Sequence, residues 1–324
     1  MLCVGLLAAG CGRSDIYQRL TWPEAFDGGE LPVLCRPADV QTFELPAKPR
    51  QPIDVLLVID DSCSMENDQK ELANNFASFI PAFLAANVSF HVGVVTTDMA
   101  KPTRLGKLVA PPLTPQTPLL ETTFQKMVQV GAQGSAIEKG IAAAYAALSE
   151  PLISNENKGF LRPEANLAVV FLTDEDDQSG YGYSPAIFTQ FLTGLKADRD
   201  AITVASILGL KQPPYCSTSV SNWKYADVAR AFLPRAHLTV CNPAYDATLK
   251  AIAGRIINSH CLIELRREID VHRPIRVTVN GQPSEWSLIP GDAMRPFGSL
   301  EVKTCPVTAA HVEITYEDCE PSPE

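Results

Sequence analysis

Residues 54–65 read DVLLVIDDSCSM, and this stretch decides the fold of the chain. Its first half is a run of apolar, mostly β-branched residues, which is typical of a strand buried on both faces in a parallel sheet. The run ends at Asp60, and Ser62 and Ser64 follow at alternate positions. The pattern therefore predicts a central strand that delivers one carboxylate and two hydroxyls to a single loop.

The sequence on both sides of this strand alternates between strand and helix patterns. Apolar runs predict strands at residues 53–59, 88–95, 167–172 and 202–208. Helical spacing and capping signals predict helices at residues 72–84, 135–149 and 187–195 and from Asn242-Pro243 onward. This alternation predicts an α/β fold, a doubly wound, mostly parallel sheet with helices on both sides, over about residues 52–262.

The period of the apolar pattern changes to two after Cys261. Ile275, Val277 and Val279 alternate with polar residues, and Asn280-Gly281 is typical of a hairpin turn. Residues 263–324 are therefore predicted to form a small C-terminal antiparallel β module. Residues 12–51 are rich in proline and are predicted to be an irregular tether.

The amino-terminal residues 1–11 read MLCVGLLAAGC, an apolar run that closes in small residues before Cys11. The run is too short for a transmembrane helix. It resembles the end of a bacterial lipoprotein signal, which implies export, lipidation at Cys11 and a membrane contact made only by the lipid anchor. By the same resemblance, Gly12 favours the outer membrane over the inner one. An ordinary cleaved signal peptide is the alternative.

The chain has nine cysteines, and seven remain outside Cys3 and Cys11. Export makes disulfides plausible, and an odd number leaves one thiol over. The candidate pairs are Cys216–Cys241, Cys305–Cys319 and Cys35–Cys261, which would leave Cys63 free, although spacing alone does not fix the connectivity. No C-x-x-C pair occurs, which argues against a zinc site.

Charge and motifs argue against several classes of function. The formal net charge is −10 and no dense Lys/Arg run occurs, so nucleic acid is not an expected partner. The sequence contains no G-x-S-x-G elbow, Walker A loop, H-E-x-x-H motif or Rossmann glycine fingerprint. A haloacid-dehalogenase-like phosphotransferase needs a second Asp where this chain has Ser62. We therefore expect a protein that is not an enzyme.

The D-x-S-x-S loop after an apolar strand resembles the first segment of the metal-ion-dependent adhesion site of von Willebrand factor A domains. The resemblance covers about residues 52–262 and implies a second loop with Ser135 in the Thr position and a third with Asp174. The implied metal site residues are Asp60, Ser62, Ser64, Ser135 and Asp174.

The resemblance implies Mg²⁺, or Ca²⁺ or Mn²⁺, as the bound cation. In such a site two hydroxyls bind the metal directly and two carboxylates bind through water. One position stays open for an acidic side chain of another protein. The implied function is an adhesion or scaffold module in the bacterial cell envelope.

Departures from the family pattern keep alternatives open. The third loop continues with Glu175 and Asp176 where the family commonly has Gly, and these residues are candidates for indirect support of the metal, as is Asp98. Ser62 and Ser64 could instead cap the following helix, and Ser135 to Glu138 also matches a capping box. A structural envelope lipoprotein with a degenerate metal site is the second hypothesis. A metal-dependent hydrolase is the third.

Overall fold

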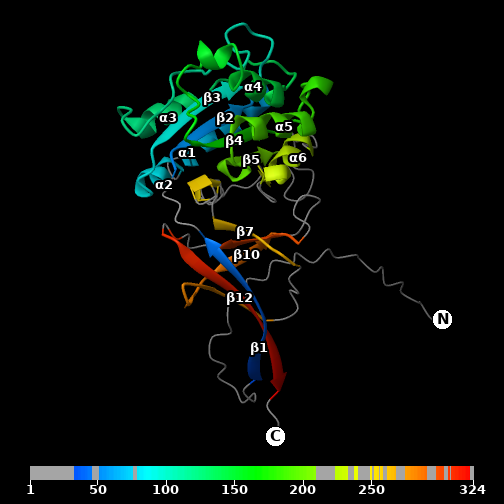
Figure 1. Ribbon diagram of the computed structural model, residues 1–324. Helices are drawn as coiled ribbons and strands as arrows, with labels where there is room; N and C mark the ends of the chain where they lie inside the picture. Colours follow the sequence, from blue (N-terminus) through cyan, green and yellow to red (C-terminus); the bar gives the residue numbers. More distant parts are fainter. Residues whose placement is uncertain are drawn as a thin grey trace, which may run out of the picture.

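The computed structural model describes two groups of secondary structure, each with its own hydrophobic core (Figure 1). The larger core belongs to an α/β unit, and the smaller one lies among antiparallel strands. The described residues are 33–45, 51–75, 79–208, 223–232, 237–239, 249, 252–254, 256–257, 261–267, 274–289, 297–302, 306 and 308–321.

A parallel five-stranded sheet forms the centre of the α/β unit, in the order β3-β2-β4-β5-β6. The strands are β2 (Ile53–Ile59), β3 (Phe90–Thr96), β4 (Asn166–Thr173), β5 (Ile202–Leu208) and β6 (His237–Thr239). Every residue of β2 is buried, as its apolar sequence predicts. The strand order reverses between β2 and β4, and ligand sites in such sheets lie at this switch point, beyond the carboxyl ends of the strands.

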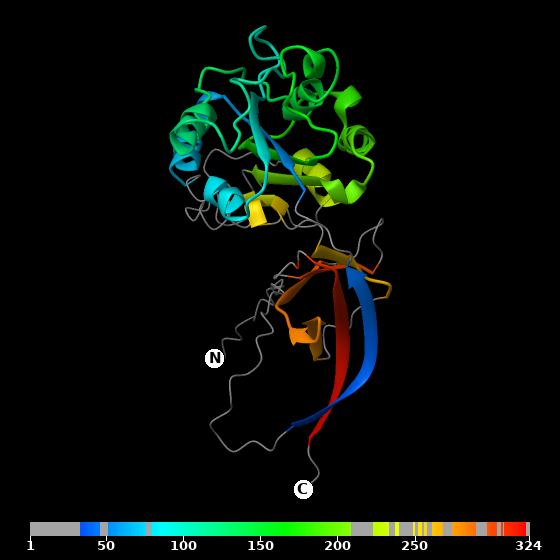
Figure 2. The same ribbon diagram turned by 60° about the vertical axis from the view of Figure 1, so that its left-hand side comes forward.

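Helices cover both faces of this sheet (Figure 2). The helices α1 and α3 lie on one side, and α5 lies on the other. They are α1 (Glu66–Asn75), α2 (Phe79–Ala85), α3 (Leu120–Val128), α4 (Gly140–Ala147), α5 (Pro185–Leu195) and α6 (Trp223–Phe232). Short 3-10 helices are η1 (Cys63–Met65), η3 (Leu152–Ser154), η4 (Tyr181–Tyr183) and η5 (Arg199–Ala201). The predicted doubly wound α/β fold is thus confirmed.

Some predicted helix boundaries are wrong. The helix expected at residues 72–84 overlaps α1 and α2, which are separated by residues outside the described ranges, and its start is wrong because α1 begins at Glu66. The helix α3 was not predicted. The helix expected from Ser135 starts five residues later, at Gly140. The start of the helix expected at Asn242-Pro243 lies outside the described residues.

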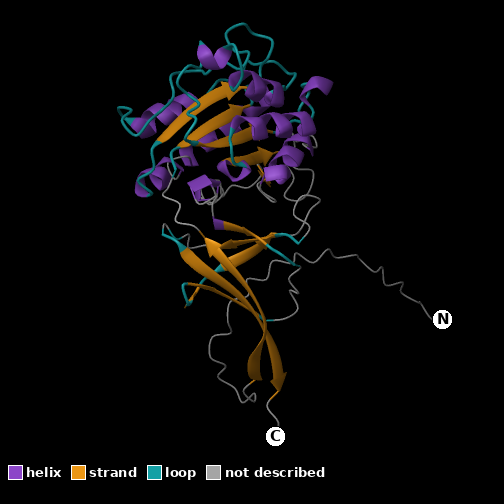
Figure 3. Ribbon diagram, in the orientation of Figure 1, coloured by secondary structure: helices purple, strands orange, loops and turns teal. Residues whose placement is uncertain are grey.

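The antiparallel strands form two small sheets (Figure 3). One has the order β1-β12-β8-β9, with β1 (Val33–Leu45), β12 (Ala310–Pro321), β8 (Ile275–Val279) and β9 (Gln282–Pro283). The other has the order β10-β11-β7, with β10 (Trp286–Ile289), β11 (Ser299–Val302) and β7 (Leu262–Glu264). Asn280 and Gly281 both have positive φ, 51° and 77°, as the predicted hairpin turn requires. The predicted β module is therefore present.

Residues 33–45 are a strand and not part of an irregular tether, so that expectation for residues 12–51 is wrong here. Phe43 is buried against the small core, and the Gln41 amide donates to the Tyr316 hydroxyl at 2.8 Å. The register shifts between Pro37 and Asp39, a bulge that accommodates proline within a strand. A buried Gln at an inward position hides the apolar alternation that would have revealed the strand.

The cysteines are only partly described. Cys35 lies opposite Cys319 in the β1–β12 register, which differs from both pairs proposed for these residues. Cys261 is buried and disulfide-bonded, and Cys63 is free and exposed. Cys11 and the predicted pair Cys216–Cys241 lie outside the described residues, as does Cys305. Among the helices that are described, none is long and apolar enough to cross a membrane.

An ion pair at the amino end of the sheet ties β2 to the segment before β4. The Asp54 side chain is fully buried and accepts from the Arg162 backbone N–H at 2.6 Å and from its Nε at 2.8 Å. Burial raises the pKa of Asp54, and the hydrogen bonds and charge of Arg162 oppose that rise. Arg162 also donates to the Ile53 carbonyl at 3.0 Å.

We predict that Arg162→Ala destabilises the protein by about 3 kcal/mol. Among the described residues, the change leaves the buried Asp54 charge with only the His91 ring, 3.7 Å away, as a side-chain partner. Urea unfolding measures the loss. Adding Asp54→Asn to this variant should recover part of the stability by removing the charge. The control is Arg230→Ala, which breaks an exposed ion pair and should change stability by less than about 0.5 kcal/mol. Equal effects of the two single variants would contradict the prediction.

Candidate metal centre

Polar side chains gather beyond the carboxyl ends of β2, β3 and β4. Asp60 follows β2 and Asp174 follows β4, so the two flank the switch point in strand order. Both are almost completely buried, with exposures of 0% and 1%. Two carboxyl groups in such positions need partners, since burying an unpaired charge is costly.

The predicted hydroxyl pair is assembled in the structure. The Ser62 and Ser64 oxygens lie 3.0 Å apart, and the Ser64 hydroxyl donates to Asp174 Oδ1 at 3.2 Å. Ser62 adopts an N-cap conformation before η1, but its side chain makes no capping hydrogen bond. The alternative in which Ser62 serves only as a helix cap is therefore not supported.

Asp60 is oriented by hydrogen bonds to both of its oxygens. The Ser62 N–H donates to Oδ1 at 2.8 Å, and the Thr173 hydroxyl donates to Oδ2 at 2.6 Å. Gln69 of α1 donates to the Asp60 carbonyl at 2.8 Å and so fixes the loop backbone. Sequence reasoning missed Thr173 and Gln69. Thr173 could have been found as the last residue of the buried strand, directly before Asp174.

The second loop lies against the first one. The Gly134 N–H donates to the Asp61 carbonyl at 2.6 Å, and a Cβ at Gly134 would lie 2.3 Å from Asp61 Oδ1. The Ser135 hydroxyl accepts from the Ile137 N–H at 3.0 Å, a local turn on the exposed side of the loop. None of the hydrogen bonds described for Ser135 reaches Asp60, Ser62 or Ser64. Its role as a ligand stays a prediction.

Glu138 is the side chain of this loop that turns inward. It is 0% exposed, and its Oε2 accepts from the Thr97 hydroxyl at the end of β3. Burial raises its pKa to about 9, helped by the Asp60 charge and by side-chain contact with Asp60, while the Thr97 bond opposes the rise. The alternative of a capping box is not supported, because Glu138 is buried against Thr97 and α4 starts only at Gly140. Sequence reasoning noticed Glu138 only as a capping residue.

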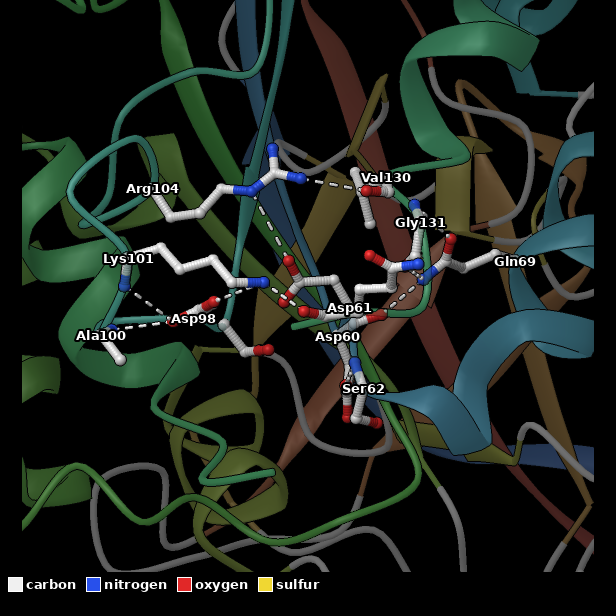
Figure 4. A network of polar contacts seen from close by, with 12 residues as sticks. Asp60, Asp61, Ser62, Gln69, Asp98, Ala100, Lys101, Arg104, Val130 and Gly131 are labelled. Carbon is white, nitrogen blue, oxygen red and sulfur yellow. Dashed lines mark hydrogen bonds and ion pairs between the residues drawn. The ribbon is translucent and has the colours of Figure 1, made fainter. Parts of the chain in front are cut away.

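Two basic residues of the loop after β3 neutralise neighbouring acids (Figure 4). Arg104 Nε lies 3.6 Å from Asp61 Oδ2, and Lys101 Nζ lies 3.7 Å from Asp98 Oδ2. Asp98 Oδ1 also accepts from two backbone N–H groups, including that of Lys101. Burial raises the pKa of Asp61 to about 6, with Arg104 opposing and Asp98 adding to the rise. Asp98 therefore fixes the backbone of the loop after β3.

The extra carboxylates of the third loop have separate roles. Glu175 is half-buried, and burial together with the charges of Asp174 and Asp60 raises its pKa. Asp176 Oδ1 accepts from the Lys224 N–H at 3.2 Å, in the first turn of α6. The supporting role of Glu175 stays a prediction, whereas Asp176 binds the first turn of α6.

Asp177, another acid of the third loop, binds the start of α4. Its Oδ1 accepts from the Ile141 N–H at 3.0 Å, and Ser179 Oγ accepts from the Ala142 N–H at 3.0 Å. The Gly140 N–H donates to the Tyr225 hydroxyl at 3.1 Å. The first N–H groups of α4, which lack partners within a helix, are thus satisfied by distant side chains. This arrangement holds the third loop against the second.

The donor set fits a small divalent cation. Adjacent ligands of an octahedron with metal–oxygen distances of about 2.1 Å lie about 3.0 Å apart, and the two serine oxygens have this separation. Glu138 Oε1 and Asp61 Oδ1 are buried without a hydrogen-bond partner. Within the described residues, no three His, Cys, Asp or Glu side chains are grouped so as to hold a metal. A cation here would therefore depend on Ser62 and Ser64.

The sheet order and flanking helices define a doubly wound α/β protein. No protein-family model and no curated protein match the sequence. Among solved structures, von Willebrand factor type A from Catenulispora acidiphila is similar at 14% identity over 92% of this chain and 68% of that chain, with a TM-score of 0.40. Proximal thread matrix protein 1 from the mussel byssus is 15% identical over 66% of this chain and 49% of its own, with a TM-score of 0.40.

The open form of the pilus adhesin SpaC from Lactobacillus rhamnosus GG is 14% identical, with a TM-score of 0.42. The similarity covers 86% of this chain and 42% of SpaC. The chain thus spans less than half of the SpaC and mussel structures that it matches. At TM-scores below 0.5 these similarities carry no argument about function, which has to be argued from the site itself.

We predict that Asp177→Ala destabilises the protein by about 1–2 kcal/mol, because the Ile141 N–H loses its acceptor. Thermal or urea unfolding measures the loss. Asp177→Asn is the matched control, since an Asn oxygen still accepts this bond, and it should lose clearly less stability. The role as a distant helix cap is wrong if the two variants are equally stable.

Proposed function

We propose that this protein is an exported, lipid-anchored module that binds another protein through a divalent cation, with Mg²⁺ as the first candidate. The observation that carries the proposal is the pair of serine oxygens 3.0 Å apart at the switch point of the sheet. Their separation matches adjacent ligands of a magnesium ion. The same 3.0 Å is a hydrogen-bond distance, so the two hydroxyls also hold each other in place without a cation.

The proposed ligands contribute in two ways, as neutral oxygens and as negative charges. Ser62 and Ser64 supply neutral hydroxyl oxygens, and Asp60 and Asp174 supply negative charge from β2 and β4. Thr173 and the Ser62 N–H hold the Asp60 carboxylate in one orientation. The loops are thereby organised in advance, which lowers the entropy lost when a cation binds.

An acidic side chain is the proposed ligand from the partner. Neutral hydroxyls leave much of the charge of the cation uncompensated, and a bound Mg²⁺ supplies an electrophilic centre for an outside oxygen. Ser64 is half-buried and Cys63 is exposed, so this loop lies where an incoming side chain can approach it. We propose binding and not catalysis, since the sequence carries no known catalytic motif.

The proposed location is the bacterial cell envelope, with the outer membrane preferred. The support is the sequence MLCVGLLAAGC, with Cys11 as the residue that carries the lipid. The disulfide at Cys261 agrees with an oxidising compartment. Labelling of the protein with a radioactive fatty acid, lost in Cys11→Ser, tests the anchor directly.

We predict that Mg²⁺ raises the melting temperature of the wild-type protein and that Asp60→Ala abolishes this rise, because a ligand that binds only the folded state stabilises it. Differential scanning fluorimetry with Mg²⁺ and with chelator measures the effect. The matched control is Asp227→Ala on the exposed part of α6, which should keep the full rise. An equal rise in wild type and Asp60→Ala would mean that the site is degenerate and that the chain has a structural role.

A further inference from the structure

The second loop brings a carboxylate to the site, although its sequence suggested a hydroxyl. Glu138 is 0% exposed, and the end of β3 fixes it from two directions. The Thr97 hydroxyl donates to Glu138 Oε2, and the Lys139 N–H donates to the Thr97 carbonyl at 3.1 Å. The Gln178 N–H donates to the Glu138 carbonyl at 2.6 Å. The residue is thus held in place by two other loops.

One oxygen of this carboxyl group remains for another partner. Glu138 Oε1 is buried without a hydrogen-bond partner, and the side chain is in contact with Asp60. A buried carboxyl oxygen without a partner is costly, and a cation at this point would supply the partner that the described residues do not. The basic side chains Lys101 and Arg104 contact Asp98 and Asp61 instead (Figure 4).

Ser135 makes a weaker case for the same position. Its hydroxyl is bound within its own turn to the Ile137 N–H, and the Ile137 side chain is 52% exposed. Glu138 instead is 0% exposed, and its Oε2 accepts from the Thr97 hydroxyl.

We propose that Glu138, and not Ser135, is the second-loop ligand of the divalent cation, which it shares with Asp60, Ser62 and Ser64. The inference rests on the proposed function. The site then has one more carboxylate than a site closed by a hydroxyl, and the affinity of oxygen sites for divalent cations rises with ligand charge. The cation is therefore retained in the absence of a partner protein.

Isothermal titration of the full chain with Mg²⁺, Mn²⁺ and Ca²⁺ chloride tests the inference. Glu138→Gln keeps the shape of the side chain and removes the charge, and its cation affinity should fall at least about tenfold. Ser135→Ala should bind within about twofold of wild type. Glu121→Gln, the same chemical change on the exposed start of α3, is the control and should bind as wild type does. Urea unfolding in chelator checks that each variant folds.

If Glu138→Gln does not fold, Glu138→Asp replaces it, because the shorter side chain keeps the charge but withdraws the ligand. The same loss of affinity is then expected. Wild-type affinity in the Glu138 variant, with a loss in Ser135→Ala, overturns this inference and leaves the proposed function intact. Absence of cation binding by the wild-type protein overturns the proposed function itself.

Discussion

The crowding of buried carboxylates at one end of a parallel sheet is the constraint on which this site depends. Because all strands of the sheet run in the same direction, the loops after β2, β3 and β4 deliver their acids to the same region. Each acid needs a partner once water is excluded. Arg104 forms an ion pair with Asp61, and Asp98 has two backbone N–H groups and Lys101 as partners. Asp60 and Glu138 contact each other, and within the described residues neither forms an ion pair.

The late start of α4 follows from the same crowding. The first N–H groups of this helix are satisfied by Asp177, Ser179 and the Tyr225 hydroxyl, which come from the third loop and α6. A local capping box is therefore not needed, and the residues before Gly140 are free to fold inward. This places the Glu138 side chain in the buried site. The third loop thus caps α4. Because α4 follows the second loop directly, this cap also fixes the position of the second loop.

Much of the fold could be predicted from the sequence. The apolar run before Asp60 marks the central strand, and the D-x-S-x-S spacing brings two hydroxyls to one loop, as the structure shows. Local patterns could not reveal partners that are distant in the chain. Glu138 matches a capping box by spacing, and only its contacts with Thr97 and Asp60 show that it points inward. Similarly, β1 has a buried Gln at an inward position and pairs with a strand more than 260 residues away in the sequence, with Cys35 opposite Cys319.

The measurement that tests the central claim most directly is a crystal structure of the protein grown with Mn²⁺ and recorded for anomalous scattering. The account predicts one strong anomalous peak at the carboxyl end of β2, within about 2.2 Å of the Ser62 and Ser64 hydroxyl oxygens. In the same map a Glu138 carboxylate oxygen should lie at a similar distance from the peak. A map with no peak at this position, or with a peak only among surface carboxylates, would contradict the account.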